Sequence, residues 1–277
     1  MTYRAILAHV EADPAAEPRL KLAAQLANDF EAVLIGAAAE TFDPAGFGSS
    51  YANVSGDLAL AEAKAVEEDL KVAESRFRAV AEQVRAGAEW RSYPDLPAEM
   101  IARQSRAADL IVAGPHRNEP MGFHNRADPG DLVMHSGRPV LIAPPTMEKL
   151  DASSIVIAWK DTREARRAVS DALPFLERAR TVMIVEVCED KDETSSRIRV
   201  QDVADHLGRH GVKASTAVRA QGGGGSVAEA VLDAAKMQDA GLIVSGGYGH
   251  ARMREWIFGG VTRDLLSQNK RAVLLSH

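Results

Sequence analysis

Glycine residues crowd one segment near the C-terminal end of the sequence, where a buried strand should give way to a helix. Gly246 and Gly249 follow an apolar run, and Gly259, Gly260 and Thr262 stand where the next helix should begin. Phosphate groups bind where backbone N–H groups converge without side chains in the way. A helix N-terminus adds free N–H groups and a partial positive charge. The spacing therefore predicts a phosphate-binding loop.

Polar side chains inside this segment admit two interpretations. His250, Arg252 and Arg254 could clamp a phosphate group through their N–H donors. Together with Glu255 they could equally form a solvated polar loop that binds nothing. The sequence leaves both interpretations open.

The glycine segment belongs to a unit that occurs twice in the chain. The run Asp109–Gly114 recurs as Ala240–Gly246, and each copy leads to a polar segment, a helical pattern and a short apolar run. Strands that alternate with helices predict a parallel sheet with helices on both faces. We therefore expect an α/β protein of two tandem domains, residues 1–146 and 152–277, each a five-stranded parallel sheet flanked by helices.

Composition excludes several classes of protein. The formal net charge is −6, from 39 acidic and 33 basic residues, which argues against a general binder of nucleic acid or of acidic membranes. No apolar run approaches the roughly 20 residues that a membrane span needs. The single cysteine, Cys188, excludes an intramolecular disulfide and a cysteine-built metal site. The N-terminal residues do not read as a signal peptide, so we expect a cytoplasmic protein.

The glycine spacing and the order of elements resemble the universal stress protein family in its tandem two-domain form. The nucleotide-binding pattern of that family is G-x2-G-x9-G followed by Ser or Thr, and Gly246, Gly249 and Gly259 stand at these places. The resemblance implies two Rossmann-like domains of the adenine nucleotide alpha hydrolase type. It also implies a site for ATP or another adenine nucleotide, which Mg²⁺ could accompany.

The resemblance further implies which strand ends hold the nucleotide. Contacts on the adenine side would come from the ends of the first two strands of the second repeat, and phosphate contacts from the glycine segment. The predicted binding residues are Ala158, Trp159, Lys160, Asp161, Val187, Gly246, Gly249, His250, Arg252, Gly259, Gly260, Val261 and Thr262.

Two positions in the second repeat depart from the family pattern. Gly260 replaces the usual Ser or Thr, which removes a hydroxyl contact but leaves a backbone N–H. Lys160 replaces an aspartate that usually ends the first strand at the adenosine site, and Asp161 follows it. We expect these departures to weaken ATP binding without changing the fold.

The first repeat departs much further. Arg117 stands where the second glycine should be, and Pro115 lacks a backbone N–H. Asp128 stands at the expected helix start, where its negative charge would repel a phosphate group. We expect the first domain to bind no nucleotide triphosphate in the family's manner, and to have a structural or partner-binding role.

These patterns favour a stress-response or regulatory protein that binds nucleotide without dedicated catalytic residues or a metal site. One alternative is an enzyme on the same fold that slowly hydrolyses ATP or transfers a nucleotidyl group, with Asp161, His250 and Thr262 as its candidate groups. The other alternative is an interaction module that binds no nucleotide. The resemblance also implies an intramolecular pseudo-dimer of the two domains through their last strands; a further homodimer stays open.

Overall fold

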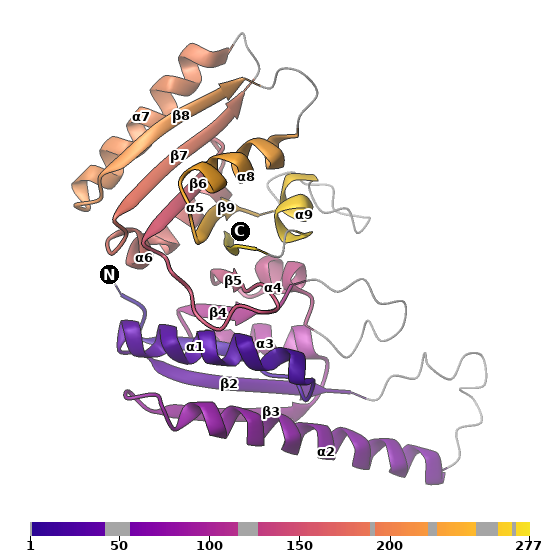
Figure 1. Cartoon of the computed structure of the whole chain (residues 1–277). Coiled ribbons are helices and arrows are strands. Elements are labelled where there is room, and N and C mark those ends of the chain that lie inside the picture. The colour runs from indigo at the N-terminus through magenta and orange to yellow at the C-terminus, as the bar shows by residue number, and fades with distance from the viewer. Residues whose placement is uncertain are drawn as a thin grey trace. The chain divides into compact units, whose positions relative to one another are not determined.

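The chain folds into two compact units, each a sheet flanked by helices (Figure 1). The first domain comprises Tyr3–Arg138 with Pro145–Lys149, and the second comprises Leu150–His277 with Pro139–Pro144. The computed structural model describes residues 2–41, 56–115, 127–188, 192–220, 226–247, 260–267 and 270–277.

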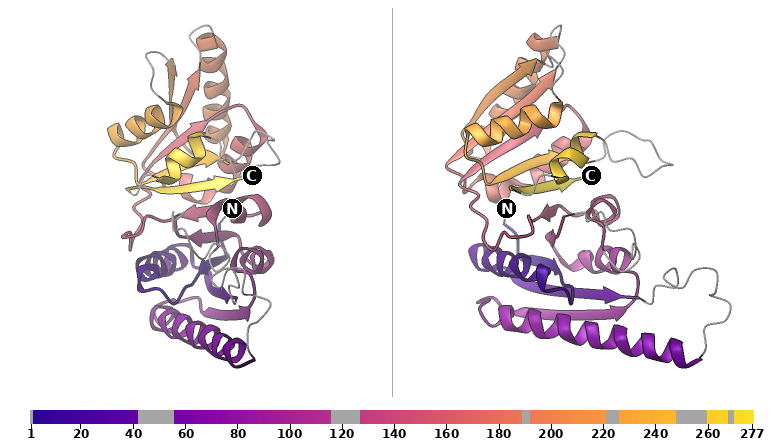
Figure 2. Two further views of the ribbon diagram at one scale, coloured as in Figure 1. Left: turned by 90° about the vertical axis from the view of Figure 1, so that its right-hand side faces the viewer. Right: turned by 45° about the vertical axis from the view of Figure 1, so that its right-hand side comes forward.

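The sheet of the first domain has four parallel strands in the order β3-β2-β1-β4. Helix α2 lies along β2 and β3 (Figures 1 and 2). The elements are β1 (Ala5–His9), α1 (Glu17–Phe30), β2 (Val33–Glu40), α2 (Gly56–Ala81), β3 (Ala88–Pro94), α3 (Pro97–Gln104), β4 (Leu110–Ala113) and α4 (Pro129–His135), with short 3-10 turns at Pro14–Ala16 and Ser105–Ala107.

The sheet of the second domain has the order β5-β10-β9-β6-β7-β8. Its elements are β5 (Val140–Ile142), β6 (Ser154–Trp159), α5 (Arg163–Asp171), α6 (Leu173–Leu176), β7 (Thr181–Cys188), α7 (Glu193–Arg209), β8 (Ala214–Ala220), α8 (Val227–Met237), β9 (Leu242–Gly246), α9 (Gly260–Ser267) and β10 (Ala272–Ser276).

Strand β5 comes from the first repeat but joins the second domain. It pairs antiparallel with β10, Leu141 opposite Leu274, whereas β6 to β10 pair parallel. The second domain therefore has five parallel strands and one antiparallel strand, β5. The α/β architecture predicted from the sequence is confirmed. The boundaries 1–146 and 152–277 stay a prediction, because the compact units are discontinuous in sequence.

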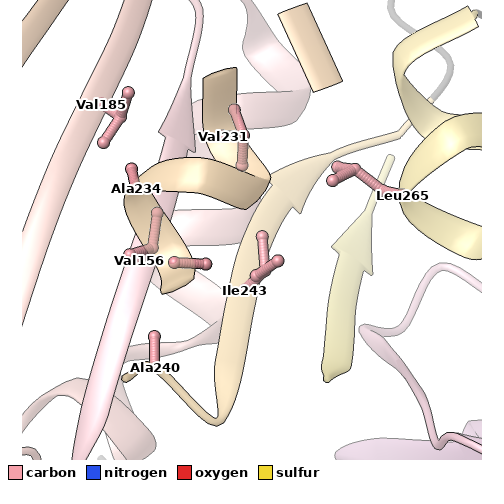
Figure 3. Close-up of a cluster of buried hydrophobic side chains, with 8 residues drawn as sticks. Val156, Val185, Val231, Ala234, Ala240, Ile243 and Leu265 are labelled. Atoms are coloured by element: carbon pink, nitrogen blue, oxygen red, sulfur yellow. The ribbon is translucent and has the colours of Figure 1, made fainter. Parts of the chain in front are cut away.

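Side chains along the strands of the second sheet alternate between its two faces. Val156, Val185 and Ile243 lie on one face and pack under Val231 of α8 and Leu265 of α9 (Figure 3). Successive side chains of a strand point to opposite faces. The residues between these positions therefore face the other side of the sheet.

Local sequence explains how the flanking helices begin and break. Ser226 caps α8, and its Oγ accepts from the Glu229 N–H at 3.1 Å while the Glu229 carboxylate accepts from the Ser226 N–H at 2.7 Å. These two hydrogen bonds form a capping box, for which a Ser with a Glu three residues later is typical. The helical pattern over 163–179 contains Pro174 and by itself predicts one helix. The structure instead ends α5 at Asp171 and begins α6 at Leu173, because proline is tolerated only in a first helical turn.

The longest described helix, α2, is amphipathic. Ala73 and Phe77 are buried against the sheet, while Glu67 and Lys71 form an exposed ion pair at 2.8 Å. Throughout the described part of the chain, no helix combines the length and the apolar character that crossing a membrane requires.

Replacement of Gly36 by alanine should destabilise the first domain. Gly36 lies in β2, and an added Cβ would stand 2.5 Å from Cδ2 of Phe77. Such overpacking costs about 1–3 kcal/mol. Gly208→Ala is the matched control, since a Cβ there meets no described atom within 4 Å and should stabilise α7 by up to ~1 kcal/mol. Urea unfolding measures both, and a destabilised control or an unaffected Gly36→Ala variant would contradict this account.

Candidate functional site

The strand order of the second sheet reverses between β6 and β9. From β6 the chain continues to β7 and β8 on one side, and from β9 to β10 on the other. Ligands of open α/β sheets bind outside the carboxyl ends of the strands at such a switch point. Parallel pairing aligns Trp159 of β6 with Glu186 of β7. The structure thus brings Ala158, Trp159, Val187 and Gly246 to one edge of the sheet.

Gly246 ends β9 where a side chain would not fit. An added Cβ would lie 2.6 Å from the backbone nitrogen of Ala165, at the start of α5. The Gly247 N–H donates to the Ser276 carbonyl at 2.9 Å, and Nδ1 of His277 lies 3.1 Å from the Gly247 oxygen. The exit of β9 is therefore fixed against both α5 and β10. This packing is a structural reason for glycine at 246, whatever the segment binds.

The loop after β6 caps helix α5. The Thr162 Oγ1 accepts from the Ala165 N–H at 3.3 Å, and the Thr162 N–H donates to the Lys160 carbonyl at 2.7 Å. Asp161 pairs with Arg166 at 2.6 Å, and both side chains are at least half exposed. Lys160 and Asp161 thus stand at the edge beside Trp159, as the resemblance implies, but the Asp161 carboxylate already has a cationic partner.

Three buried polar atoms share one row across this edge. Ser276 pairs in register with Gly246, and Trp159 pairs with Glu186. Gly246 faces α5, so its row neighbours face that side too. Ser276 Oγ, Trp159 Nε1 and Glu186 Oε2 are buried and have no hydrogen-bond partner in the described structure. Buried polar atoms usually find a partner, from protein, water or ligand.

Sequence reasoning missed the Glu186 cluster. Glu186 Oε1 accepts from Ser196 Oγ at 3.2 Å and from Arg199 Nη2 at 2.6 Å, and Arg199 also contacts Asp192 at 2.9 Å. These hydrogen bonds, that from Glu186 first, raise the pKa of the Arg199 guanidinium. Glu186 is 5% exposed. A lone acid within the apolar run 181–187 was the signal that could have revealed it, because buried carboxylates require partners.

Helix α9 begins at Gly260, beside the same edge. Val261 packs against the core cluster under α8, and Thr262 is 6% exposed. The predicted binding residues Gly249, His250, Arg252 and Gly259 lie outside the described residues. Within those that are described, no group of three or more His, Cys, Asp and Glu side chains is arranged to hold a metal ion.

Solved structures share this two-domain fold. A universal stress protein from Archaeoglobus fulgidus is 15% identical, with a TM-score of 0.71 over 98% of this chain and 95% of that one. A putative universal stress protein from Pseudomonas aeruginosa is 14% identical, with a TM-score of 0.59 over 99% of this chain and 93% of that one. At such identities these likenesses show the fold alone. No curated protein matches the sequence.

The fold and the switch point define a tandem α/β protein of the Rossmann-like class. The model of the universal stress protein family matches residues 152–277. The chain thus carries a universal stress protein domain in its second half and a domain of the same fold upstream, which confirms the resemblance drawn from the sequence.

The first domain carries an acidic corner at the end of β2. Burial, followed by the charge of Asp69 and a hydrogen bond with it, raises the pKa of Glu40 to about 7. The charge of Glu11 acts in the same direction. The folded chain therefore holds a proton on Glu40 at pH values where an unfolded chain, with a pKa near 4.5, has released it.

Stability of the first domain should fall as pH rises from about 4.5 to about 7, because the folded state must then give up the Glu40 proton. Partial exposure of the side chain limits the loss to about 1 kcal/mol. The side chain of the Glu40→Gln variant does not titrate. As the pH rises across that range, the free energy of unfolding of the wild type should therefore fall relative to that of the variant. Urea titrations at pH 5 and 8 measure it; a constant difference would contradict the prediction.

Proposed function

We propose that the second domain binds ATP or another adenine nucleotide at the carboxyl edge of β6, β7 and β9. The role would be regulatory, in the response to stress, without dedicated catalysis. The observation that carries the proposal is the switch point itself. There a glycine-ended strand, Gly246, and the start of α9 at Gly260 stand at the edge of a universal stress protein domain.

The residues at this edge suit the chemistry of a nucleotide. Backbone N–H groups at the start of a helix favour phosphate, and Gly260 brings no side chain that would block their approach. The exposed Lys160 adds positive charge at the corner after β6. Trp159 Nε1 supplies a donor, and Glu186 Oε2 and Ser276 Oγ supply acceptors, that lack partners among the described residues.

Binding without dedicated catalysis follows from how the nearby acids are held. Asp161 is paired with Arg166 and Glu186 with Arg199, each at 2.6 Å. A general base must reach the proton that it removes. Neither acid is presented in that way, so the proposal assigns them to structure and keeps slow hydrolysis or nucleotidyl transfer as the outcome that a turnover assay would reveal.

The pairing of β5 with β10 supports a further part of the proposal. These strands are the last of each repeat, and three residue pairs join them, from Val273–Ile142 to Leu275–Val140. We propose that the two repeats form an intramolecular pseudo-dimer, in which the first repeat contributes β5 to the sheet of the second domain. It would take the place of the contact that two single-domain chains would make with each other.

Thermal unfolding with and without millimolar ATP–Mg²⁺ tests nucleotide binding. Ligand at about a hundred times its dissociation constant stabilises by about 2.7 kcal/mol, a rise on the order of several degrees. Gly260→Asp should abolish the rise, because a carboxylate at the first helical residue repels phosphate. Gly208→Asp, which adds the same charge in the exposed part of α7, should retain it.

Two results would overturn the proposal. One is a wild-type melting temperature that does not respond to ATP, adenosine diphosphate or adenosine monophosphate at millimolar concentration. The other is an equal response in wild type and in both glycine variants, which would place the nucleotide elsewhere.

A further inference from the structure

A buried guanidinium occupies the switch point of the first domain. Arg19 of α1 donates through Nε to the His9 carbonyl at 3.1 Å, and through Nη2 to the Glu11 carboxylate at 2.7 Å. The side chains of Arg19 and Glu11 are only 7% and 17% exposed. His9 ends β1, so the guanidinium sits at the carboxyl end of that strand.

The same guanidinium also covers the end of β4, the neighbour of β1. A Cβ added to Gly114 would collide with Nη1 of Arg19, which means that Arg19 fills the space beside that glycine. Because β1 and β4 flank the point where the strand order reverses, Arg19 stands where an open α/β sheet would receive a ligand.

A second internal group occupies the start of α4. Asp128 Oδ1 accepts from the Gly130 N–H at 2.7 Å and so takes up a donor that a helix N-terminus would offer to an anion. Burial, with the charge of Asp128 as the next cause, raises the pKa of Asp131 in the same helix. Negative charge is therefore already in excess at this helix start, which disfavours a phosphate group.

The second domain carries different groups after its first strand and beside the glycine that follows its fourth strand. In the first repeat Ile6 pairs with Leu110 of the fourth strand, and in the second repeat Ile155 pairs with Leu242 of the fourth strand. When these pairs are aligned, Lys160 takes the position of Glu11. The next residue, Asp161, forms an exposed ion pair with Arg166, whereas the ion pair of Glu11 with Arg19 is largely buried. Backbone and Cβ atoms of Glu164 and Ala165 are the nearest atoms to a Cβ added at Gly246, whereas the guanidinium of Arg19 is the nearest group at Gly114.

We propose that the first domain is a self-occupied site: the guanidinium of Arg19 and the carboxylate of Asp128 fill the ligand positions of its sheet edge, so that it binds no nucleotide. Pro115 lacks a donor and Arg117 replaces a glycine, but Arg19 and Asp128 are the side chains that occupy the described strand and helix ends. Their removal opens a site for a phosphate-bearing ligand at the first sheet edge. This inference does not depend on nucleotide binding by the second domain.

The experiment counts nucleotides per chain by native mass spectrometry and equilibrium dialysis with millimolar ATP. The opened variant is Arg19→Ala/Asp128→Ser, in which serine keeps a capping hydroxyl for α4. It should bind one nucleotide more than wild type. The control Lys21→Ala/Asp29→Asn also removes one positive and one negative charge, at exposed positions of α1, and should bind as wild type does.

Each count separates the two proposals. An added nucleotide in the opened variant supports the self-occupied site, whether or not the wild type binds a nucleotide. A wild type that binds none would contradict only the proposed function of the second domain. A folded opened variant with the wild-type count, or a wild type that binds two nucleotides, overturns the inference. Should the opened variant fail to fold, Arg19→Gln/Asp128→Ser keeps a donor and most of the packed volume, and is judged by the same count.

Discussion

Parallel pairing of β6 with both of its neighbours is the constraint on which the second domain depends. It places the ends of three strands in one row, so that residues distant in sequence meet at a single edge. The edge also explains why glycine stands at 246, where the first turn of α5 approaches the backbone too closely for any side chain. The proposed ligand site and a packing requirement thus share one residue.

The two domains share one architecture, but the side chains at their sheet edges differ in charge and burial. In the first domain a buried arginine and a capping aspartate satisfy the strand and helix ends from within. In the second, Asp161 and Arg166 form an exposed ion pair, and three buried polar atoms of the row have no described partner. Internal groups can therefore satisfy the hydrogen bonds of strand and helix ends that a ligand would otherwise make, and the fold is kept.

Much of the fold could be predicted because it follows from local pattern. The repeated apolar runs gave strands that pair in parallel, and Ser226 with Glu229 gave the start of α8. The break of the helix at Pro174 and the partner of β5 could not be predicted with the same ease. A proline is compatible with either a kink or a new helix, and the partner of a short apolar strand depends on residues far away in the chain.

The sequence by itself determined the two repeats, the glycine spacing and the membership of the second half in the universal stress protein family, since each depends on residue types at fixed intervals. Only the tertiary structure decided that Glu186 is buried with Arg199, and that Arg19 lies against Gly114. Helical residues and strand ends are brought together by packing across the sheet, and no interval along the chain encodes which arginine will reach which strand. The chemistry of each edge is therefore a property of the folded domain.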